Sequence, residues 1–336
     1  MAPTGVAAQR IDGKTIHSAL RITHQGGTFV TRALTDPTLK SALSEVRTLI
    51  IDEVSMVSAQ LLSFISDLFA KIHGNAYAFG GINVVLVGDL AQLPPVNGTP
   101  VYYSPIWKLF YPLFLTNSRR QENDLVFYRL LEEVRFGNIS SSSWRMLSAK
   151  LNESTSITNG SAALTTTHIV GYRESAMKIN VSICNLLNTP PSKFLVNYAI
   201  DTVNGSICSF DETHCMFKNK TNLPKMIRLQ QGARVMFLNN QHFDKGICNG
   251  TIGVVTDVDQ EHLTTRVAFA VQNGIIDLEV RCIVSTFYVN GKLCSRKQFP
   301  LQNCFATTVH KAQGLTLPDV CLVLDKQFFS PGHTLL

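Results

Sequence analysis

Charged side chains are scarce in this sequence. Asp, Glu, Lys and Arg make up only 16% of the 336 residues, well below the roughly 25% typical of soluble proteins. Hydrophobic residues make up 45%, and intrinsically disordered chains show the opposite balance. The composition therefore excludes disorder and predicts a folded chain. At about 150 residues per domain, its length favours two domains.

Long apolar runs are absent as well. No stretch of the sequence approaches the ~18–20 uninterrupted apolar residues that a bilayer-spanning helix requires, so we expect no membrane partner. Acids are also outnumbered, because 30 Lys and Arg face 24 Asp and Glu, which gives a net charge of +6. An excess of this size does not by itself identify a polyanionic partner.

Paired cysteines are missing too. The sequence has eight cysteines but no C-x-x-C pair, and no secretory signal is evident. We therefore expect reduced thiols in an intracellular protein rather than disulfides or a zinc site. Matches to N-x-[ST], such as residues 97–99, are then expected to be coincidental in a chain rich in Asn, Ser and Thr.

The first third of the sequence predicts a strand–helix–strand unit. Apolar runs at 49–51 and 82–87 have the character of central strands in a parallel sheet. Between them, residues 58–69 repeat apolar side chains at helical spacing, with Ser58 in the position of an N-cap. Two such strands joined through a helix form a right-handed crossover.

The rest of the sequence predicts a second α/β region and a β-rich region within 240–300. In the β-rich region short β-prone runs follow one another with Gly-rich turns and no helices, which indicates a small antiparallel barrel inserted into an α/β domain. The predicted elements are helices at 125–136 and 175–187, a strand at 168–170, a loop over 137–161, and strands at 251–255, 266–271 and 275–280.

Two carboxylates directly follow the first predicted strand, in Ile50-Ile51-Asp52-Glu53. They are expected at the carboxyl edge of the sheet, where α/β proteins bind ligands. In nucleotide triphosphatases, the first carboxylate of such a pair holds Mg²⁺ through water and the second polarises the attacking water. The alternative is a strand end with two solvated acids.

The second predicted strand also ends in polar residues, in the segment from Gly88 to Pro95. Gly88 lets the chain leave the sheet sharply and the proline pair fixes its exit, which places Asp89 and Gln92 at the same edge as Asp52. A neutral amide there can hydrogen-bond a γ-phosphate or the attacking water. The alternative is a rigid proline turn, and the acid pair one crossover upstream favours the functional interpretation.

A basic stretch lies near the end of the sequence. From Arg281 to Pro318 there are five cationic side chains and no acid. Charge alone leaves two interpretations open, a solvated loop face or a surface for a polyanion.

Five segments together resemble the petite-integration-frequency (PIF-type) DNA helicases, a branch of superfamily one. They are APTGVAA (2–8), TIHSAL (15–20), IIDEVSMVSAQLL (50–62), FGGINVVLVGDLAQLPPV (79–96) and TTVHKAQGLTL (307–317), in the order that this family uses. The resemblance implies ATP-driven 5′→3′ translocation on single-stranded DNA, with ATP and Mg²⁺ as cofactors and forked DNA as a further partner. It also implies roles in telomere maintenance, DNA repair and recombination, in the nucleus or mitochondrion, and leaves the oligomeric state open.

The resemblance implies a fold as well. We expect an α/β protein with two RecA-like parallel-sheet domains of the P-loop NTPase type and a small β-barrel inserted in the second. The first domain is expected over 1–118, truncated at its N-terminus, with a small insertion at about 21–46. The second is expected over 119–240 and 301–336, with the barrel at 241–300.

Roles for individual residues follow from the same resemblance. A guanidinium such as that of Arg120 suits the γ-phosphate because it stays charged and binds phosphate oxygens bidentately, and backbone N–H groups at a Thr-Gly turn can hold a DNA phosphate without reading sequence. The expected catalytic residues are Asp52, Glu53, Gln92 and Arg120, with Asp52 also holding magnesium through water. Asp89 and Gly314 are added to them as nucleotide-binding residues. The expected DNA-binding residues are Pro3, Thr4, Gly5, Thr15, His17, Thr308, His310, Lys311, Gln313 and Thr316.

One expected motif, G-x-x-x-x-G-K-[ST], is absent from the printed residues. Gly13-Lys14-Thr15 does not qualify, because the first glycine of the motif would fall at position 8, which is Ala8. In the family this phosphate loop precedes APTGVAA, and an arginine-finger segment follows the region of Gly332. We therefore expect the printed chain to be inactive alone. Two interpretations stay open, a helicase represented by part of its sequence and a non-catalytic nucleic-acid-binding remnant.

Overall fold

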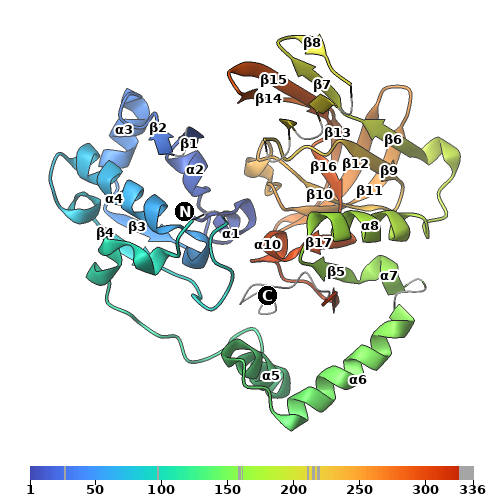
Figure 1. Ribbon diagram of the computed structural model, residues 1–336, viewed down its shortest axis with the longest axis horizontal. Helices are drawn as coiled ribbons and strands as arrows, with labels where there is room; N and C mark the ends of the chain where they lie inside the picture. Colours follow the sequence, from blue (N-terminus) through green and yellow to red (C-terminus); the bar gives the residue numbers. More distant parts are fainter. Residues whose placement is uncertain are drawn as a thin grey trace. The chain divides into compact units, whose positions relative to one another are not determined.

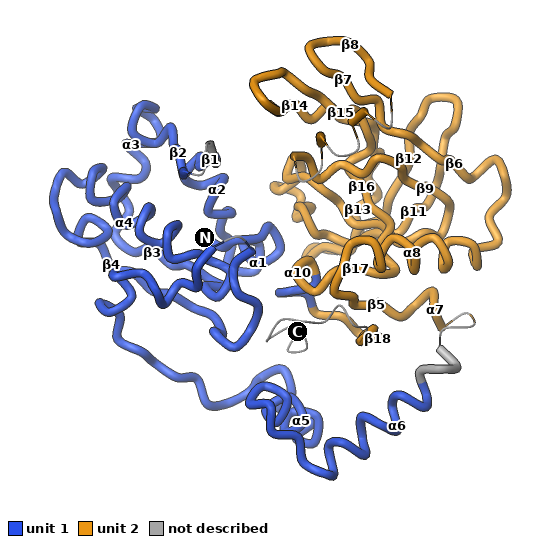
Figure 2. Tube along the Cα trace, viewed as in Figure 1, with its two compact units in different colours: residues 1–154, 312–315, 328–336 blue, residues 155–311, 316–327 orange. Residues whose placement is uncertain are grey.

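The computed structural model describes residues 1–25, 28–96, 98–157, 160, 162–209, 212–213, 216–217 and 220–324 (Figure 1). Asn97 and the region of Gly332 lie outside these described residues. The chain forms two compact units (Figure 2). The first unit comprises residues 1–154 and 312–315, and the second comprises residues 155–311 and the described residues from 316 onwards.

A parallel strand pair lies at the centre of the first unit. Strand β3 (Thr48–Ile51) pairs with β4 (Asn83–Leu86) from Thr48 opposite Asn83 to Ile51 opposite Leu86. Helix α4 (Ala59–His73) lies between the two strands in sequence, which confirms the predicted strand–helix–strand unit. The side chain of Ser58 accepts a hydrogen bond from the N–H of Leu61 (3.1 Å) and so caps the helix as predicted.

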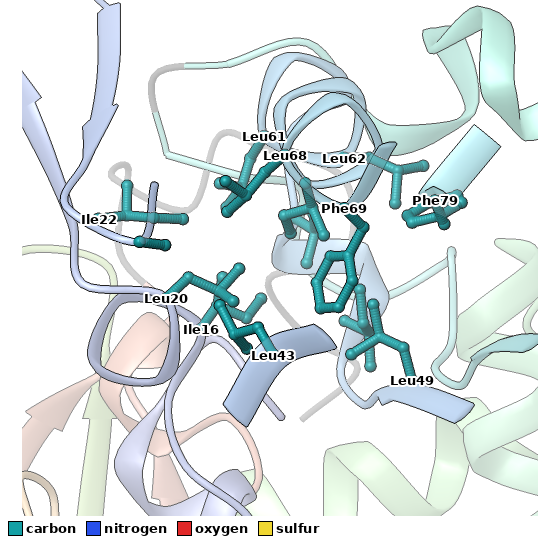
Figure 3. Close-up of a cluster of buried hydrophobic side chains, with 14 of the residues drawn as sticks. Ile16, Leu20, Ile22, Leu43, Leu49, Leu61, Leu62, Leu68, Phe69 and Phe79 are labelled. Atoms are coloured by element: carbon teal, nitrogen blue, oxygen red, sulfur yellow. The ribbon is translucent and has the colours of Figure 1, made fainter. Parts of the chain in front are cut away.

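The core of the first unit forms between this strand pair and helix α4. Along β3, exposed and buried residues alternate, so that Leu49 and Ile51 face inwards while Thr48 and Ile50 do not. Leu62 and Phe69 of α4 belong to the same buried cluster (Figure 3). This packing fixes the strand ends that carry the polar residues discussed below.

A short hairpin is attached to the same core. Helix α2 (Ile16–Ala19) leads into strands β1 (Ile22–Gln25) and β2 (Thr28–Thr31), which pair antiparallel with Ile22 opposite Thr31. Ile16, Leu20 and Ile22 point into the core (Figure 3). The remaining elements near the start of the chain are α1 (Gly5–Arg10) and α3 (Pro37–Ser44). The hairpin and α3 occupy the position of the predicted insertion at 21–46.

Helix α5 (Leu125–Phe136) matches its predicted bounds, but the predicted loop over 137–161 is wrong in its longest part. Helix α6 spans Ser141–Ile157. The oxygen of the Ser140 side chain accepts a hydrogen bond from the N–H of Ser143 (3.3 Å), so the serine cluster begins a helix. Serine favours turns and helix N-termini alike, which is why the sequence misled us here. Residues 158–159 and 161 lie outside the described part.

Short 3₁₀ turns complete the first unit. They are η1 (Val54–Met56), η2 (Ala78–Gly81), η3 (Val101–Tyr103) and η4 (Pro105–Leu109). The two compact units divide near residue 154, whereas the sequence placed the domain boundary at 118. That boundary stays a prediction.

The second unit contains a parallel sheet in the order β17-β5-β18. Its strands are β17 (Ala306–Thr308), β5 (Thr167–Val170) and β18 (Val320–Leu322). Helix α8 (Arg173–Cys184) packs against it, and the amide of Asn180 exchanges two hydrogen bonds with the backbone of Ala306 (2.8 and 2.9 Å). The strand predicted at 168–170 is therefore confirmed, and the helix predicted at 175–187 ends at Cys184. Helices α7 (Ala162–Thr165) and α10 (Val309–Ala312) flank the sheet in sequence.

The predicted β-rich region forms an antiparallel sheet in the order β13-β12-β11-β10-β16. Its strands are β10 (Arg234–Phe237), β11 (Ile252–Asp259), β12 (Thr264–Val271), β13 (Gly274–Arg281) and β16 (Leu301–Asn303). The three predicted strands are confirmed as β11, β12 and β13. Because β10 and β16 lie outside 241–300, the predicted bounds of the insertion remain a prediction.

A second antiparallel sheet has the order β14-β15-β7-β8, and β6 pairs with β9. The elements are β14 (Ile283–Val289), β15 (Lys292–Gln298), β7 (Ile200–Val203), β8 (Ser206–Ile207), β6 (Phe194–Tyr198), β9 (Met226–Gln230), η5 (Pro191–Lys193) and η6 (Phe243–Lys245). Among the described residues, no helix has the length and apolar character needed to cross a membrane.

Candidate functional site

The acid pair lies at the carboxyl end of β3, as the sequence predicted. The N–H of Asp52 donates to the carbonyl of Met1 (3.0 Å), and the N–H of Val87 donates to the carbonyl of Ile51 (2.8 Å). One oxygen of the Asp52 carboxylate accepts the N–H of Glu53 (2.9 Å). These bonds bring the start of the chain, the acid pair and the end of β4 to one edge of the sheet.

Glu53 has an unusual backbone conformation. Its φ of 52° and ψ of 46° lie in the left-handed region, which a residue other than glycine rarely adopts. The next residue, Val54, donates its N–H to the carbonyl of Val87 (3.0 Å). A Cβ atom on Gly88 would lie only 2.7 Å from the nitrogen of Val54, so this close approach requires glycine. Backbone strain of this kind concentrates at functional sites.

The environment of Glu53 raises the pKa of its carboxyl group above the ordinary value. Burial is the largest cause, and the negative charge of Asp52 acts in the same direction. A hydrogen bond from Gln313 and the positive charges of Arg10 and Arg120 oppose the shift. A general base works best when its pKa is closer to neutral pH than that of a free carboxylate. The local electrostatics therefore suit Glu53 to accepting a proton.

Gln313 lies against the acid pair. The side chain is only 3% exposed, and its Nε2 is 3.2 Å from Oε2 of Glu53, 3.3 Å from Oγ of Ser55 and 3.4 Å from Oε1 of Gln92. An amide group has two hydrogens, so it can donate to two of these three oxygens at a time. Its own oxygen is buried and has no hydrogen-bond partner among the described residues.

This position differs from the one the resemblance implied for Gln313, which was a contact with DNA. The contact with DNA stays a prediction, and the structure adds a position beside the expected base and Gln92. Gly314 lies in the same place, because a Cβ atom there would be 3.7 Å from Oε1 of Glu53. The segment TTVHKAQGLTL thus brings two neighbouring residues, from 312–315 of the first unit, to the acid pair.

Asp89 organises the turn that carries Gln92. Its Oδ1 accepts hydrogen bonds from the N–H of Ala91 (3.0 Å) and from the guanidinium of Arg135 in α5 (2.9 Å), and its carbonyl accepts the N–H of Gln92 (3.0 Å). The carboxylate therefore has a structural role in this conformation. Its predicted contact with nucleotide is not tested by these bonds.

Two arginines act on Glu53 through their charge. Arg120, expected to reach the γ-phosphate, is near enough for its charge to lower the pKa of Glu53. Arg10 has the same effect, and the sequence reasoning missed this residue. It ends helix α1, two positions beyond the segment APTGVAA. A cation so close to a predicted phosphate-contacting segment was a signal that we could have used.

The donor set at this edge fits Mg²⁺. This ion prefers oxygen ligands, keeps several waters, and is commonly held by one or two carboxylates together with substrate phosphates. Asp52 and Glu53 supply half-buried carboxylates at the end of one strand. Within the described residues, no cluster of three or more His, Cys, Asp or Glu side chains is arranged to hold a metal ion. The carboxylates therefore suit a partly hydrated ion that shares its ligands with a nucleotide.

The predicted DNA-contacting residues of the first unit lie close together. Ala2 bridges to Thr15, with its N–H donating to the carbonyl of Lys14 (3.2 Å) and its carbonyl accepting the N–H of Ile16 (2.9 Å). Thr4 caps α1 and Thr15 caps α2, each through its hydroxyl oxygen at 3.3 Å from a backbone nitrogen. Within the same set Pro3 is half-buried, Gly5 is buried and His17 is exposed. Their DNA contacts remain predictions.

The predicted DNA-contacting residues of the second unit are less accessible. Thr308 is buried in β17, His310 is half-buried and Thr316 is exposed. The amine of Lys311 donates to Oε1 of Gln302 (2.7 Å), and burial lowers the pKa of that amine. The structure therefore shows Lys311 engaged within the protein, whereas the sequence favoured an available cation.

The basic stretch from Arg281 to Pro318 meets acids in space. Arg296 forms a buried ion pair with Asp201 of β7 (2.7 Å), and Arg281 pairs with Glu279 (2.7 Å). The lack of acids along the sequence is therefore partly compensated by residues outside the stretch. Neither a solvated loop face nor a surface for a polyanion, the two interpretations left open by charge alone, therefore describes all five cations.

Comparisons with known proteins identify the family. The PIF1-like helicase family model matches residues 1–145, and the model of the DNA helicase Pif1 2B domain matches residues 218–258. The ATP-dependent DNA helicase Pif1 of Bdellovibrio bacteriovorus is 30% identical over 347 residues, covering 99% of this chain and 73% of that protein. The human ATP-dependent DNA helicase PIF1 is 30% identical over 347 residues. That match covers 98% of this chain and 50% of the human protein.

Solved structures agree with this result. The crystal structure of Pif1 helicase from Candida albicans has a TM-score of 0.75 and 26% identity, covering 99% of this chain and 80% of that one. Bacteroides Pif1 bound to single-stranded DNA has a TM-score of 0.75 and 25% identity, with coverage of 99% and 78%. The same TM-score and identity hold for a structure described as the basis for DNA unwinding at forked double-stranded DNA by two coordinating Pif1 helicases, with coverage of 99% and 77%. The predicted fold class of two RecA-like domains is confirmed. This chain belongs to the Pif1 family of ATP-dependent DNA helicases.

Proposed function

We propose that this protein is a 5′→3′ helicase that couples ATP hydrolysis to translocation on single-stranded DNA and to unwinding of forked duplexes. The observation that carries the proposal is the arrangement around Glu53. The backbone of Glu53 is strained, and its half-buried carboxylate has a raised pKa. This carboxylate lies beside Asp52 and accepts a hydrogen bond from the amide of Gln313, and the charges of Arg10 and Arg120 act on its pKa.

Each residue at this edge has a defined part in the proposed reaction. Glu53 accepts the proton of the attacking water, and Gln92 orients that water or the γ-phosphate. Arg120 binds phosphate oxygens as negative charge moves towards the leaving group. Asp52 would hold Mg²⁺ through water, and that ion, when bound, neutralises phosphate charge. Gln313 keeps the carboxylate of Glu53 and the amide of Gln92 in fixed relative positions.

The proposed DNA path uses contacts that do not read sequence. Thr4 and Thr15 place the N-terminal ends of α1 and α2 next to each other, and backbone N–H groups at such positions can hold phosphates. The solved relatives bound to single-stranded DNA and at forked DNA support this partner class. We further propose the family's roles in telomere maintenance, repair and recombination. We also propose a location in the nucleus or mitochondrion, which imaging of a tagged protein would test.

A second candidate is a non-catalytic protein that binds single-stranded nucleic acid. It shares the proposed DNA path with the first candidate and differs from it in lacking ATP hydrolysis. No phosphate loop of the form G-x-x-x-x-G-K-[ST] lies within the printed 336 residues. Such a loop supplies backbone donors and a lysine to the β- and γ-phosphates. Asp52, Glu53, Gln92 and Arg120 cannot replace them.

We therefore expect the polypeptide of residues 1–336 to bind single-stranded DNA but to hydrolyse ATP negligibly. The measurement is phosphate release by the purified polypeptide with and without single-stranded DNA. Turnover near one per second would overturn this expectation. An extended chain, which adds a phosphate loop and an arginine-finger segment at the two ends, should regain DNA-stimulated hydrolysis. If the extended chain binds ATP and DNA without hydrolysis, the non-catalytic candidate is favoured.

A further inference from the structure

A second basic stretch, near the start of the chain, has no acid along its length. Residues 13–35 contain Lys14, Arg21 and Arg32 together with two histidines, and no Asp or Glu. The acids that border this stretch are Asp12 and Asp36. The stretch runs through helix α2 and the hairpin β1–β2, so its cations are carried on one small substructure of the first unit.

Two cations of this stretch, Arg21 and Arg32, line a pocket with a volume of about 380 Å³. Volumes of this size are at the lower end of those found for small-ligand sites. The pocket is lined by His17, Arg21, Ile22, Thr23, Val30, Thr31 and Arg32. We call it the hairpin pocket. It is apart from the acid pair, none of whose residues line it.

The substructure around the hairpin pocket is firmly anchored. Ile16, Leu20 and Ile22 are at most 5% exposed and point into the core of the first unit (Figure 3). The hydroxyl of Thr31 donates to the carbonyl of Leu20 and accepts the N–H of Ala33 (3.0 Å). The backbone on both sides of Arg32 is therefore fixed, while its side chain is exposed.

Asp36 compensates only one of these cations. One oxygen of its carboxylate accepts the N–H of Leu39 (3.1 Å) and caps helix α3. The other oxygen accepts a single hydrogen bond from Nη1 of Arg21 (2.7 Å), whose side chain remains 59% exposed. A guanidinium has five N–H donors, so four remain for another ligand. Arg32 forms no ion pair within the part of the chain that the structure describes.

The backbone of Arg21 is strained. Its φ of 46° lies in the left-handed region, as does that of Glu53. A conformation of this kind persists only where the surroundings impose it, and it occurs preferentially at ligand-binding positions. Here the α2 turn, the core residue Ile22 and the bond to Asp36 hold Arg21 at the rim of the hairpin pocket.

From these observations we propose that the hairpin pocket binds a phosphate of the DNA backbone through Arg21 and Arg32, with His17 at its edge. The inference rests on the proposed DNA-binding function and adds two residues that the motifs did not indicate. Guanidinium groups bind phosphate oxygens bidentately and stay charged at any working pH. Such a contact positions the strand without reading its sequence.

The test is the affinity of the polypeptide of residues 1–336 for a labelled single-stranded oligonucleotide, measured by fluorescence anisotropy at several salt concentrations. In the variant Arg32→Ala, affinity should fall roughly threefold or more at low salt for oligonucleotides of any sequence. The slope of log affinity against log salt should become shallower by about 0.7, the value for one phosphate contact on a single strand. Arg32→Lys should keep most of the slope because it keeps the charge.

Arg47→Ala is the matched control. Arg47 is an exposed arginine of the same unit that precedes β3 and does not line the hairpin pocket, so the control should keep the wild-type slope. Equal losses in Arg32→Ala and Arg47→Ala would show a general charge effect and overturn the proposal. Arg21→Gln should reduce the slope in the same way as Arg32→Ala, and circular dichroism checks that each variant is folded.

Two further outcomes separate this proposal from the function on which it rests. If the wild-type polypeptide does not bind single-stranded DNA, the proposed function and the hairpin-pocket proposal both fail. If the wild type binds and Arg32→Ala binds equally well with the same slope, only the proposal for the hairpin pocket fails. Inorganic phosphate provides the last arm. Suppose that inorganic phosphate raises the melting temperature of the wild type but not of Arg32→Ala, and that the two proteins bind DNA with equal affinity. The pocket then holds free phosphate rather than DNA.

Discussion

The two units each contain a carboxylate with strong interactions, but their environments shift its pKa in opposite directions. In the first unit, burial and the nearby charge of Asp52 raise the pKa of Glu53. In the second unit, burial alone would raise the pKa of Asp201, but hydrogen bonds from Arg296 and Thr213 and the charge of Arg296 outweigh it and lower the pKa.

The contacts explain the difference. Asp201 is bound bidentately by Arg296, at 2.7 Å for each of two bonds, and accepts a third bond from Thr213 (2.6 Å). Glu53 has the amide of Gln313 at 3.2 Å and the positive charges of two arginines near it. Removing the partner of a fully paired buried carboxylate destabilises the fold, whereas an incompletely paired carboxylate on a strained backbone is available for chemistry.

The largest expected effect is on catalysis in the first unit. In the extended chain, Glu53→Gln should lower DNA-stimulated ATP hydrolysis by roughly 10³-fold or more, because an amide of the same size cannot take a proton from water. ATP binding should largely remain. Urea unfolding should show no loss of stability, because the amide replaces a charge whose burial is unfavourable. Asp67→Asn, on the exposed side of α4, is the control. Equal turnover in Glu53→Gln and wild type would show that the base is misassigned.

The next effect concerns the fold of the second unit. Arg296→Ala should lower the free energy of unfolding by about 3–5 kcal/mol, because it leaves Asp201 charged and buried without its partner. The same change removes the bond from Arg296 to the carbonyl of Leu223 (3.1 Å) and its contact with the ring of Phe217.

Arg266→Ala is the matched control for this change. Arg266 pairs with Asp277 at 2.9 Å, but their side chains are 50% and 42% exposed, so the cost should stay below about 1 kcal/mol. Urea denaturation of the two variants measures the difference. Similar losses in both would mean that the buried pair contributes no more than a surface pair.

The positions of these partners could not be predicted from the sequence, whereas local features could. The N-cap at Ser58 and the short β-prone runs that form β11 and β12 depend on residues a few positions apart, so local sequence patterns identified them. Gln313 and Glu53 are 260 positions apart, and Arg296 and Asp201 are 95 apart. Such contacts depend on the tertiary fold. The resemblance therefore identified the segment that contains Gln313, but it did not indicate that Gln313 lies beside Glu53.

A smaller catalytic effect is expected from Gln313. In the extended chain, Gln313→Ala should lower hydrolysis by roughly 10- to 100-fold, since it removes the donor that holds Glu53 and Gln92 together but leaves the base in place. A larger rise in KM for ATP than fall in kcat would contradict a role in positioning the base. Gln272→Ala, an exposed glutamine in the turn between β12 and β13, is the control and should have wild-type kinetics.

The smallest expected effect is the pH dependence of the second unit. Because the pKa of Asp201 is lower in the folded state than in the unfolded chain, where it is about 3.9, its ionised form stabilises the fold at higher pH. That contribution is present above the unfolded value and is lost as the pH falls through the folded value. The stability advantage of wild type over Asp201→Asn should therefore shrink as the pH is lowered below about 4. Urea unfolding at a series of acidic pH values measures this difference. A difference that stays constant with pH would show that the Arg296 pair does not lower the pKa of Asp201, and the contrast with Glu53 would then fail.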